Sequence, residues 1–126
     1  MSYQVELQRC PDYIRAEVTG VRQPVQAVSD AHLVGRQIVA ECRDTGIEKI
    51  LLVLQLTGRM TALDAYEIVV DSQEYGWSRS FRLAYVDLNT DSCSDSLFTE
   101  TVAVNRAFQL KVFDNEHDAT EWLLNP

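Results

Sequence analysis

Hydroxyl and guanidinium groups gather in one short stretch, LTGRMT, which follows a long apolar run and precedes a segment with helical spacing. In open α/β sheets, ligands collect at the carboxyl ends of strands, near helix N-termini whose free N–H groups attract anions. The stretch therefore predicts a ligand- or partner-binding site, with Thr57, Gly58, Arg59 and Thr61 as its residues. A plainer interpretation stays open, in which Gly58 permits a turn and Thr61 only caps the helix.

Other catalytic and metal-binding patterns are weak. One glycine without a following Lys-Ser/Thr pair does not make a phosphate loop. No serine lies in a GxSxG motif, and no cysteine adjoins a histidine. His32 and His117 belong to separate predicted helices, and neither begins an HxxxH pattern. We therefore expect a protein that is not an enzyme, with no catalytic residues, no metal site and no cofactor.

The elements that position the stretch begin with a hairpin. Residues 3–9 and 13–19 each alternate apolar and polar side chains around a turn at Cys10-Pro11-Asp12. A helix capped by Ser29 is predicted to run to about Asp44. Its apolar side is expected to contain Leu33, Val34, Ile38, Val39 and Cys42. Residues 47–56 are almost continuously apolar, which is typical of a central strand covered on both faces.

A second helix is predicted from Thr61 to about Tyr75. Thr61 and Asp64 have the spacing of a capping box, and the apolar side is expected to contain Leu63, Tyr66, Ile68 and Val69 or Val70. The remaining predicted elements are a strand over 81–88, a polar loop, a helix over 96–106 with Leu97, Val102 and Ala103 facing inward, a strand over 108–113 and a helix capped by Asp114 or Asn115. The order ββαβαβαβα predicts an α/β fold with a mixed, mostly parallel sheet and right-handed crossovers.

Composition narrows the class of function. The chain has 126 residues, so we expect one domain over 1–126. Its formal net charge of −8 repels phosphate backbones, so nucleic acid is not an expected partner. No apolar run approaches the roughly 18 residues that a membrane span needs, so no integral membrane segment is expected. Cys10, Cys42 and Cys93 show no CxxC spacing, which favours reduced thiols and a cytoplasmic location.

Three segments together carry a family resemblance: KILLVLQLTGRMTALDAYEIV, RLAYVDL, and FTETVAVNRAFQLKVFDNEHDATEWL. They resemble the SpoIIAA-like family of small bacterial STAS-type domains, which are related in fold to anti-anti-sigma factors. The resemblance covers about residues 3–124. It implies a sheet of four to five strands with an N-terminal hairpin and about four helices packed mainly on one side. It also implies a likeness to the lipid-binding CRAL-TRIO architecture.

The resemblance bears on the candidate site. In anti-anti-sigma factors, the loop after the corresponding strand carries an Asp-Ser pair whose serine is phosphorylated by the partner kinase. The corresponding stretch here is Thr57-Gly58-Arg59-Met60-Thr61, which lacks Asp-Ser. By position, Thr61 is the candidate for phosphorylation.

The leading hypothesis is a cytoplasmic regulatory module that binds a protein partner. An alternative is a carrier of a small apolar or lipid ligand held between sheet and helices, in a cavity lined by Leu63, Tyr66, Phe98 and Trp122. Association with a second copy of the chain as a homodimer also stays open.

Overall fold

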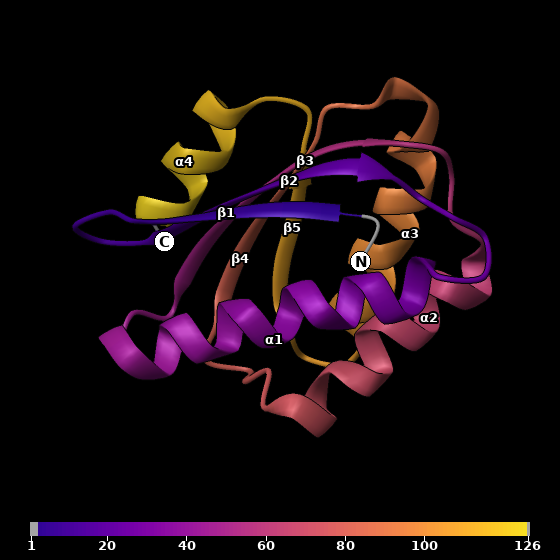
Figure 1. The fold of residues 1–126 in the computed structure, drawn as a ribbon. Coiled ribbons are helices and arrows are strands. Elements are labelled where there is room, and N and C mark those ends of the chain that lie inside the picture. The colour runs from indigo at the N-terminus through magenta and orange to yellow at the C-terminus, as the bar shows by residue number, and fades with distance from the viewer. Residues whose placement is uncertain (1–2, 126) are drawn as a thin grey trace.

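A five-stranded sheet flanked by helices forms the body of the protein, in a computed structural model that describes residues 3–125 (Figure 1). Two short 3-10 turns, Ser72–Tyr75 and Thr90–Ser92, precede β4 and α3. The main elements in chain order are β1 (Tyr3–Arg9), β2 (Ile14–Val21), α1 (Ala27–Thr45), β3 (Lys49–Thr57), α2 (Ala62–Asp71), β4 (Arg82–Asp87), α3 (Cys93–Asn105), β5 (Gln109–Phe113) and α4 (Glu116–Leu124).

The strands lie in the order β1-β2-β3-β4-β5. The first two form the predicted antiparallel hairpin, and the other neighbouring pairs are parallel. The predicted fold class is therefore confirmed. Because β2, β3 and β4 run in the same direction, the loops that follow them meet at one edge of the sheet.

The central strand β3 is buried on both faces, as its apolar sequence predicts. Ile50, Leu52, Leu54 and Leu56 contribute to the core beneath α1, whereas Leu51 and Val53 belong to a second cluster with Ala119 and Leu123 of α4. Figure 1 shows α1 and α2 on one side of the sheet and α4 on the other. The α3 helix joins α2 through Val69, Val102 and Ala103.

Two predicted helix starts are wrong, and both helices begin earlier than expected. The carbonyl of Gln23 accepts hydrogen bonds from the amides of Gln26 and Ala27, so the turn after Pro24 continues directly into α1. Ser29 lies inside the helix, where its hydroxyl donates to the Gln26 carbonyl at 3.1 Å. Likewise, the 3-10 turn after Asn89 leads straight into α3 at Cys93 rather than Ser96.

The predicted apolar side of α2 is right for Val69 but wrong for Leu63 and Tyr66. Leu63 and Tyr66 are 64% and 42% exposed, while Ala65 and Val69 face the core. Met60 precedes the N-cap Thr61 and is itself buried, so it and Ala65 occupy the two positions of a hydrophobic staple. With Ala65 and Val69 inward, Leu63 faces outward. Leu33 of α1 and Leu97 of α3, expected inside, are also exposed.

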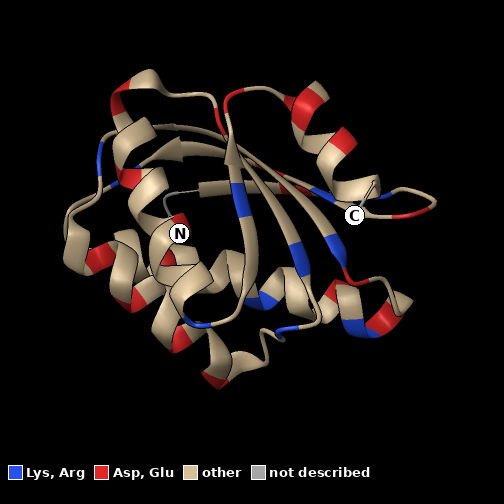
Figure 2. Ribbon diagram, turned by 180° about the vertical axis from the view of Figure 1, so that it is seen from behind, with Lys and Arg blue, Asp and Glu red and all other residues tan. Residues whose placement is uncertain are grey.

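Charge is spread widely over the surface. Viewed from behind, acidic residues are distributed over the helices and loops, while several basic residues lie along the strands (Figure 2). Arg15 contacts Glu116 at 2.6 Å and Glu17 at 2.8 Å, which ties β2 to the start of α4. Within residues 3–125, no helix combines the length and apolar character needed to cross a membrane.

Candidate functional site

The predicted site residues lie at the edge of the sheet where β2, β3 and β4 end. Val21 of β2 pairs with Thr57 of β3, and the Arg22 amide donates to the Thr57 carbonyl at 2.9 Å. Gly58 then turns the chain with a φ of 83°, a left-handed conformation that favours glycine. We call this edge the rim and define it as Val21, residues 57–61, Leu88 and Asn89.

Arg59 is held by α3 rather than left free for an anion. Its Nε and Nη2 atoms donate to the two carboxyl oxygens of Asp95 at 3.1 and 2.9 Å, a bidentate geometry that fixes both side chains. The Met60 amide donates to the same carboxyl group at 3.4 Å. Arg59 is 64% exposed, whereas Asp95 is 12% exposed. The loop after β3 is therefore fastened to the first turn of α3.

The Arg59 guanidinium lowers the pKa of Asp95 below its ordinary value of 3.8, chiefly through this hydrogen bond. The pair therefore stabilises the fold above about pH 3.8, and its contribution is lost as pH falls through the folded-state pKa. We predict that Arg59→Gln raises the pKa of Asp95 toward the ordinary value. A ¹³C NMR titration of the carboxyl group measures this. An unchanged pKa in the variant would show that the guanidinium is not the cause.

Thr61 caps α2 through a complete capping box, as predicted. Its Oγ1 accepts from the Asp64 amide at 3.0 Å, and the Asp64 carboxyl accepts from the Thr61 amide at 3.2 Å. The hydroxyl of Thr61 therefore already has a structural role, although the residue is exposed. The interpretation of Thr61 as a helix cap is therefore confirmed.

Loss of this cap should be measurable. We predict that Thr61→Ala lowers the free energy of unfolding by about 1 kcal/mol, because the Asp64 amide loses its acceptor. Thr61→Ser should keep most of the stability, since it retains the hydroxyl. Urea denaturation of the three proteins tests the prediction, and equal midpoints for alanine and serine would contradict it.

A buried arginine supports the rim from below. Arg22 is 6% exposed, and its Nη1 donates to the carbonyl of Gly58 at 3.0 Å. Asn89 reaches the same carbonyl from the loop after β4 at 3.5 Å. Sequence reasoning missed Arg22, although a lone arginine directly after a buried strand was a signal. The Gly58 carbonyl therefore joins the loops that follow β2, β3 and β4.

The end of β4 supplies a second buried polar cluster. Asp87 is 4% exposed, and its carboxyl accepts from the hydroxyls of Ser92 at 2.7 Å and Ser96 at 2.6 Å. The Asn89 amide donates to its other oxygen at 3.0 Å. Ser92 and Ser96 are fully buried. These contacts fix the loop after β4 against α3, beside the loop that carries Arg59.

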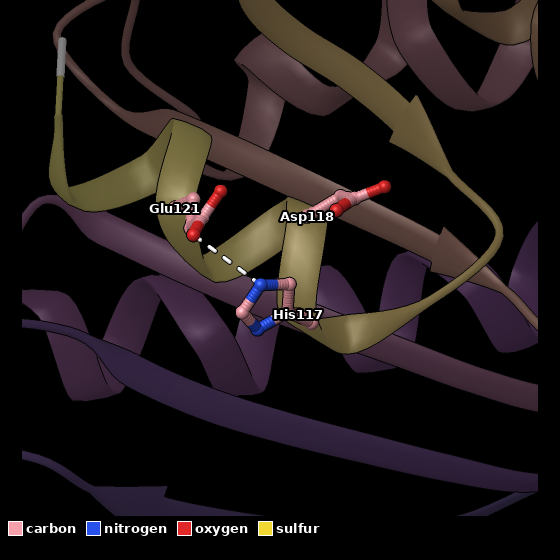
Figure 3. A group of neighbouring side chains, drawn as sticks. All are labelled: His117, Asp118 and Glu121. Atoms are coloured by element: carbon pink, nitrogen blue, oxygen red, sulfur yellow. Dashed lines mark ion pairs between the residues drawn. The ribbon is translucent and has the colours of Figure 1, made fainter.

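One group of side chains brings metal-ligand atoms together among the described residues. His117, Asp118 and Glu121 place one ligand atom each within 4.8 Å of one another on α4 (Figure 3). All three are exposed, and His117 lies 3.3 Å from Glu121, one helical turn away. This geometry is that of an ordinary i,i+4 pair on a helix surface.

A cavity of about 130 Å³ lies between the sheet and helices α1, α2 and α3. The four residues expected to line it do not, because Leu63, Tyr66 and Phe98 are exposed and Trp122 packs with Phe113 on the α4 side. The apolar part of its wall includes Val34, Leu54, Leu56, Val69, Ala103 and Phe108. Tyr3, Tyr75, Tyr85 and Arg22 supply polar groups.

Exposed apolar side chains lie in the rim and beside it. Val21 and Leu88 are 48% and 44% exposed at the ends of β2 and β4. Leu63, in the first turn of α2, is 64% exposed. Leu97 and Phe98 are 49% and 42% exposed on α3, the helix to which Arg59 is bound. Sequence reasoning missed this surface because it assigned Leu63 and Leu97 to the core.

Comparison with known proteins bears on the fold. No family model matches this sequence, and no curated protein matches it. Among solved structures, the chain is similar to the crystal structure of an anti-sigma factor antagonist from Mycobacterium paratuberculosis. The two are 13% identical with a TM-score of 0.59, and the match covers 98% of this chain and 96% of that one. The fold is therefore that of a SpoIIAA-type STAS protein, as the resemblance in sequence implied.

Proposed function

We propose that this protein is a non-enzymatic regulatory module of the cytoplasm that binds a protein partner through the rim. The observation that carries the proposal is the set of exposed apolar side chains around the anchored loop, above all Val21, Leu63 and Leu88. Contiguous apolar surface rimmed by polar groups is typical of protein interfaces. Thr57, Gly58, Arg59 and Thr61 would supply the polar contacts of the same interface.

Rigidity of the loop supports this role. Arg59 is fixed by Asp95, Thr61 by the capping box, and Gly58 by Arg22. A surface that is already ordered loses less conformational entropy when a partner binds. The fold neighbour is described as an anti-sigma factor antagonist, so an anti-sigma factor of the host is the first partner to test.

Thr61 is the residue that we propose for phosphorylation. The N-terminus of α2 favours negative charge, and Thr61 is exposed. Phosphorylation would add about two negative charges next to Asp64 and alter the capping box. It would therefore change the surface offered to the partner. Intact-mass analysis of protein from its own host, followed by peptide mapping, tests this. Protein without phosphate at Thr57 and Thr61 under every growth condition would contradict it.

Negative charge placed in the rim, at Leu88, and beside it, at Leu63, tests the partner-binding proposal. The double variant Leu63→Asp, Leu88→Asp should lose a partner that crosslinks to the wild-type protein in its host. Val104→Asp is the matched control, because Val104 is 55% exposed near the C-terminal end of α3, away from the rim. Light scattering of each protein alone shows whether the partner is a second copy of the chain. Equal crosslinking by all three proteins, or none, would refute the proposal.

A second candidate function, the carrier of a small apolar ligand, is favoured by the cavity. Its volume of about 130 Å³ is close to the roughly 150 Å³ of an apolar cavity that holds benzene. That size suits a small molecule rather than the acyl chain of a lipid. The two functions are compatible, since the cavity lies beneath the rim.

A further inference from the structure

The cavity contains one feature that an apolar ligand alone does not explain. Arg22 forms part of its wall and is 6% exposed. Nη1 donates to the Gly58 carbonyl, but among residues 3–125 the buried Nη2 has no hydrogen-bond partner of good geometry. A buried guanidinium without full hydrogen bonding is costly, because the lost hydration is not replaced. Such a group in a cavity wall points to a missing acceptor.

A buried acid of α1 does not supply that acceptor. Asp30 of α1 is 3% exposed, but its Oδ2 also lacks a partner, so Nη2 and Oδ2 do not bond to each other. Asp30 is not among the residues that line the cavity.

Tyrosine hydroxyls are the other polar groups of the wall. Burial raises the pKa of Tyr3 and of Tyr75 to about 12, and burial also raises the pKa of Tyr85. The three phenols therefore stay protonated at neutral pH and can act as hydrogen-bond donors. The positive charge of Arg22 opposes the rise at both Tyr3 and Tyr85, which places the guanidinium near these two rings. Charge and donors thus favour an anionic acceptor.

We propose that the cavity binds a small monocarboxylate with an apolar body, whose carboxylate accepts from Nη2 of Arg22. This inference rests on the carrier function and names its ligand class. A planar guanidinium recognises a carboxylate better than any neutral group of similar shape. Val34, Leu54, Val69 and Phe108 would surround the apolar body. A cavity of slightly larger volume holds benzene, so the apolar body would have about five to six non-hydrogen atoms, as in hexanoate or benzoate.

The test compares charged and neutral probes of nearly equal shape. Benzoate, hexanoate and benzyl alcohol are titrated into the full chain while methyl NMR signals are followed. Cavity methyl groups of Val34, Leu54 and Val69 report binding, and those of the exposed Leu63 and Val104 are the reference. We expect benzoate to shift the cavity methyls and to bind at least about tenfold more tightly than benzyl alcohol, because the bond to Arg22 is charge-assisted.

Two variants complete the design. Arg22→Met should weaken benzoate at least about tenfold and leave benzyl alcohol unchanged. Arg9→Met makes the same change of charge at an exposed site that pairs with Glu41, and it should bind benzoate as the wild type does. The comparison of probes on wild-type protein decides the matter even if Arg22→Met does not fold.

The outcomes separate the inference from the function beneath it. Equal binding of benzoate and benzyl alcohol in the cavity would keep the carrier function and overturn the carboxylate. Shifts confined to Leu63 and Val104, or none with any probe, would overturn both. Neither result affects the proposal that the rim binds a partner.

Discussion

Replacing Asp87 with alanine is expected to lower the free energy of unfolding by about 3 kcal/mol. The carboxyl of Asp87 accepts from two buried serine hydroxyls and from the Asn89 amide, so alanine leaves buried donors without an acceptor. Ser92 can still donate to the Asn89 carbonyl at 3.2 Å, which limits the loss. Urea denaturation at neutral pH measures the change.

Two controls accompany this prediction. Asp87→Asn keeps one acceptor oxygen, and we expect a loss of about 1 kcal/mol. Asp91→Ala removes a carboxyl four residues further on that is exposed, and it should have almost no effect. If Asp87→Ala and Asp91→Ala had the same unfolding midpoint, the buried cluster would not hold the loop after β4.

Replacing Gly58 with alanine is expected to cost about 2 kcal/mol of stability. Gly58 has a φ of 83°, where a side chain is strained, and a Cβ atom would lie 3.0 Å from the carbonyl oxygen of Arg22. The substitution should also displace the loop, so the amide NMR signals of Arg59 and Asn89 should shift. Chemical denaturation and an amide spectrum measure both effects.

Gly46 is the matched control for Gly58. It ends α1 with a φ of 76°, almost the same conformation, but a Cβ there would meet nothing within 4 Å. We expect Gly46→Ala to cost about 1 kcal/mol, from backbone strain alone. The difference between the two variants isolates the contact with Arg22. Equal losses would show that the approach of Arg22 does not matter.

Much of the fold could be predicted because it is encoded locally. Alternation in residues 3–9 and 13–19 fixed the hairpin, and the apolar run of 47–56 placed β3 at the centre of the sheet. The rotation of α2 could not be read from its own spacing. Ala65 is buried and Leu63 is exposed, and Met60, a residue outside the helix, is buried at the position that a hydrophobic staple uses.

In the candidate site, too, contacts between residues close in sequence could be predicted, and contacts between distant residues could not. Thr61 and Asp64 could be paired from sequence because a capping box spans three residues. The partner of Arg59 could not, since Asp95 lies 36 residues away and meets it only after α3 packs beside the loop. Arg22 likewise reaches Gly58 across 36 residues, through the parallel pairing of β2 and β3. Whether these residues bind a partner is still a prediction.

Arg22 would couple the two proposed binding events in the thermodynamic sense. A guanidinium is planar and rigid, so Nη1 at the Gly58 carbonyl and Nη2 at the cavity wall cannot be oriented independently. A carboxylate that fixes one nitrogen changes the free energy of the loop held by the other. Linkage requires the reverse as well, so a partner that fixes the loop must change the affinity of the cavity for its ligand by the same factor. One side chain would thus make the protein a reciprocal sensor of metabolite and partner.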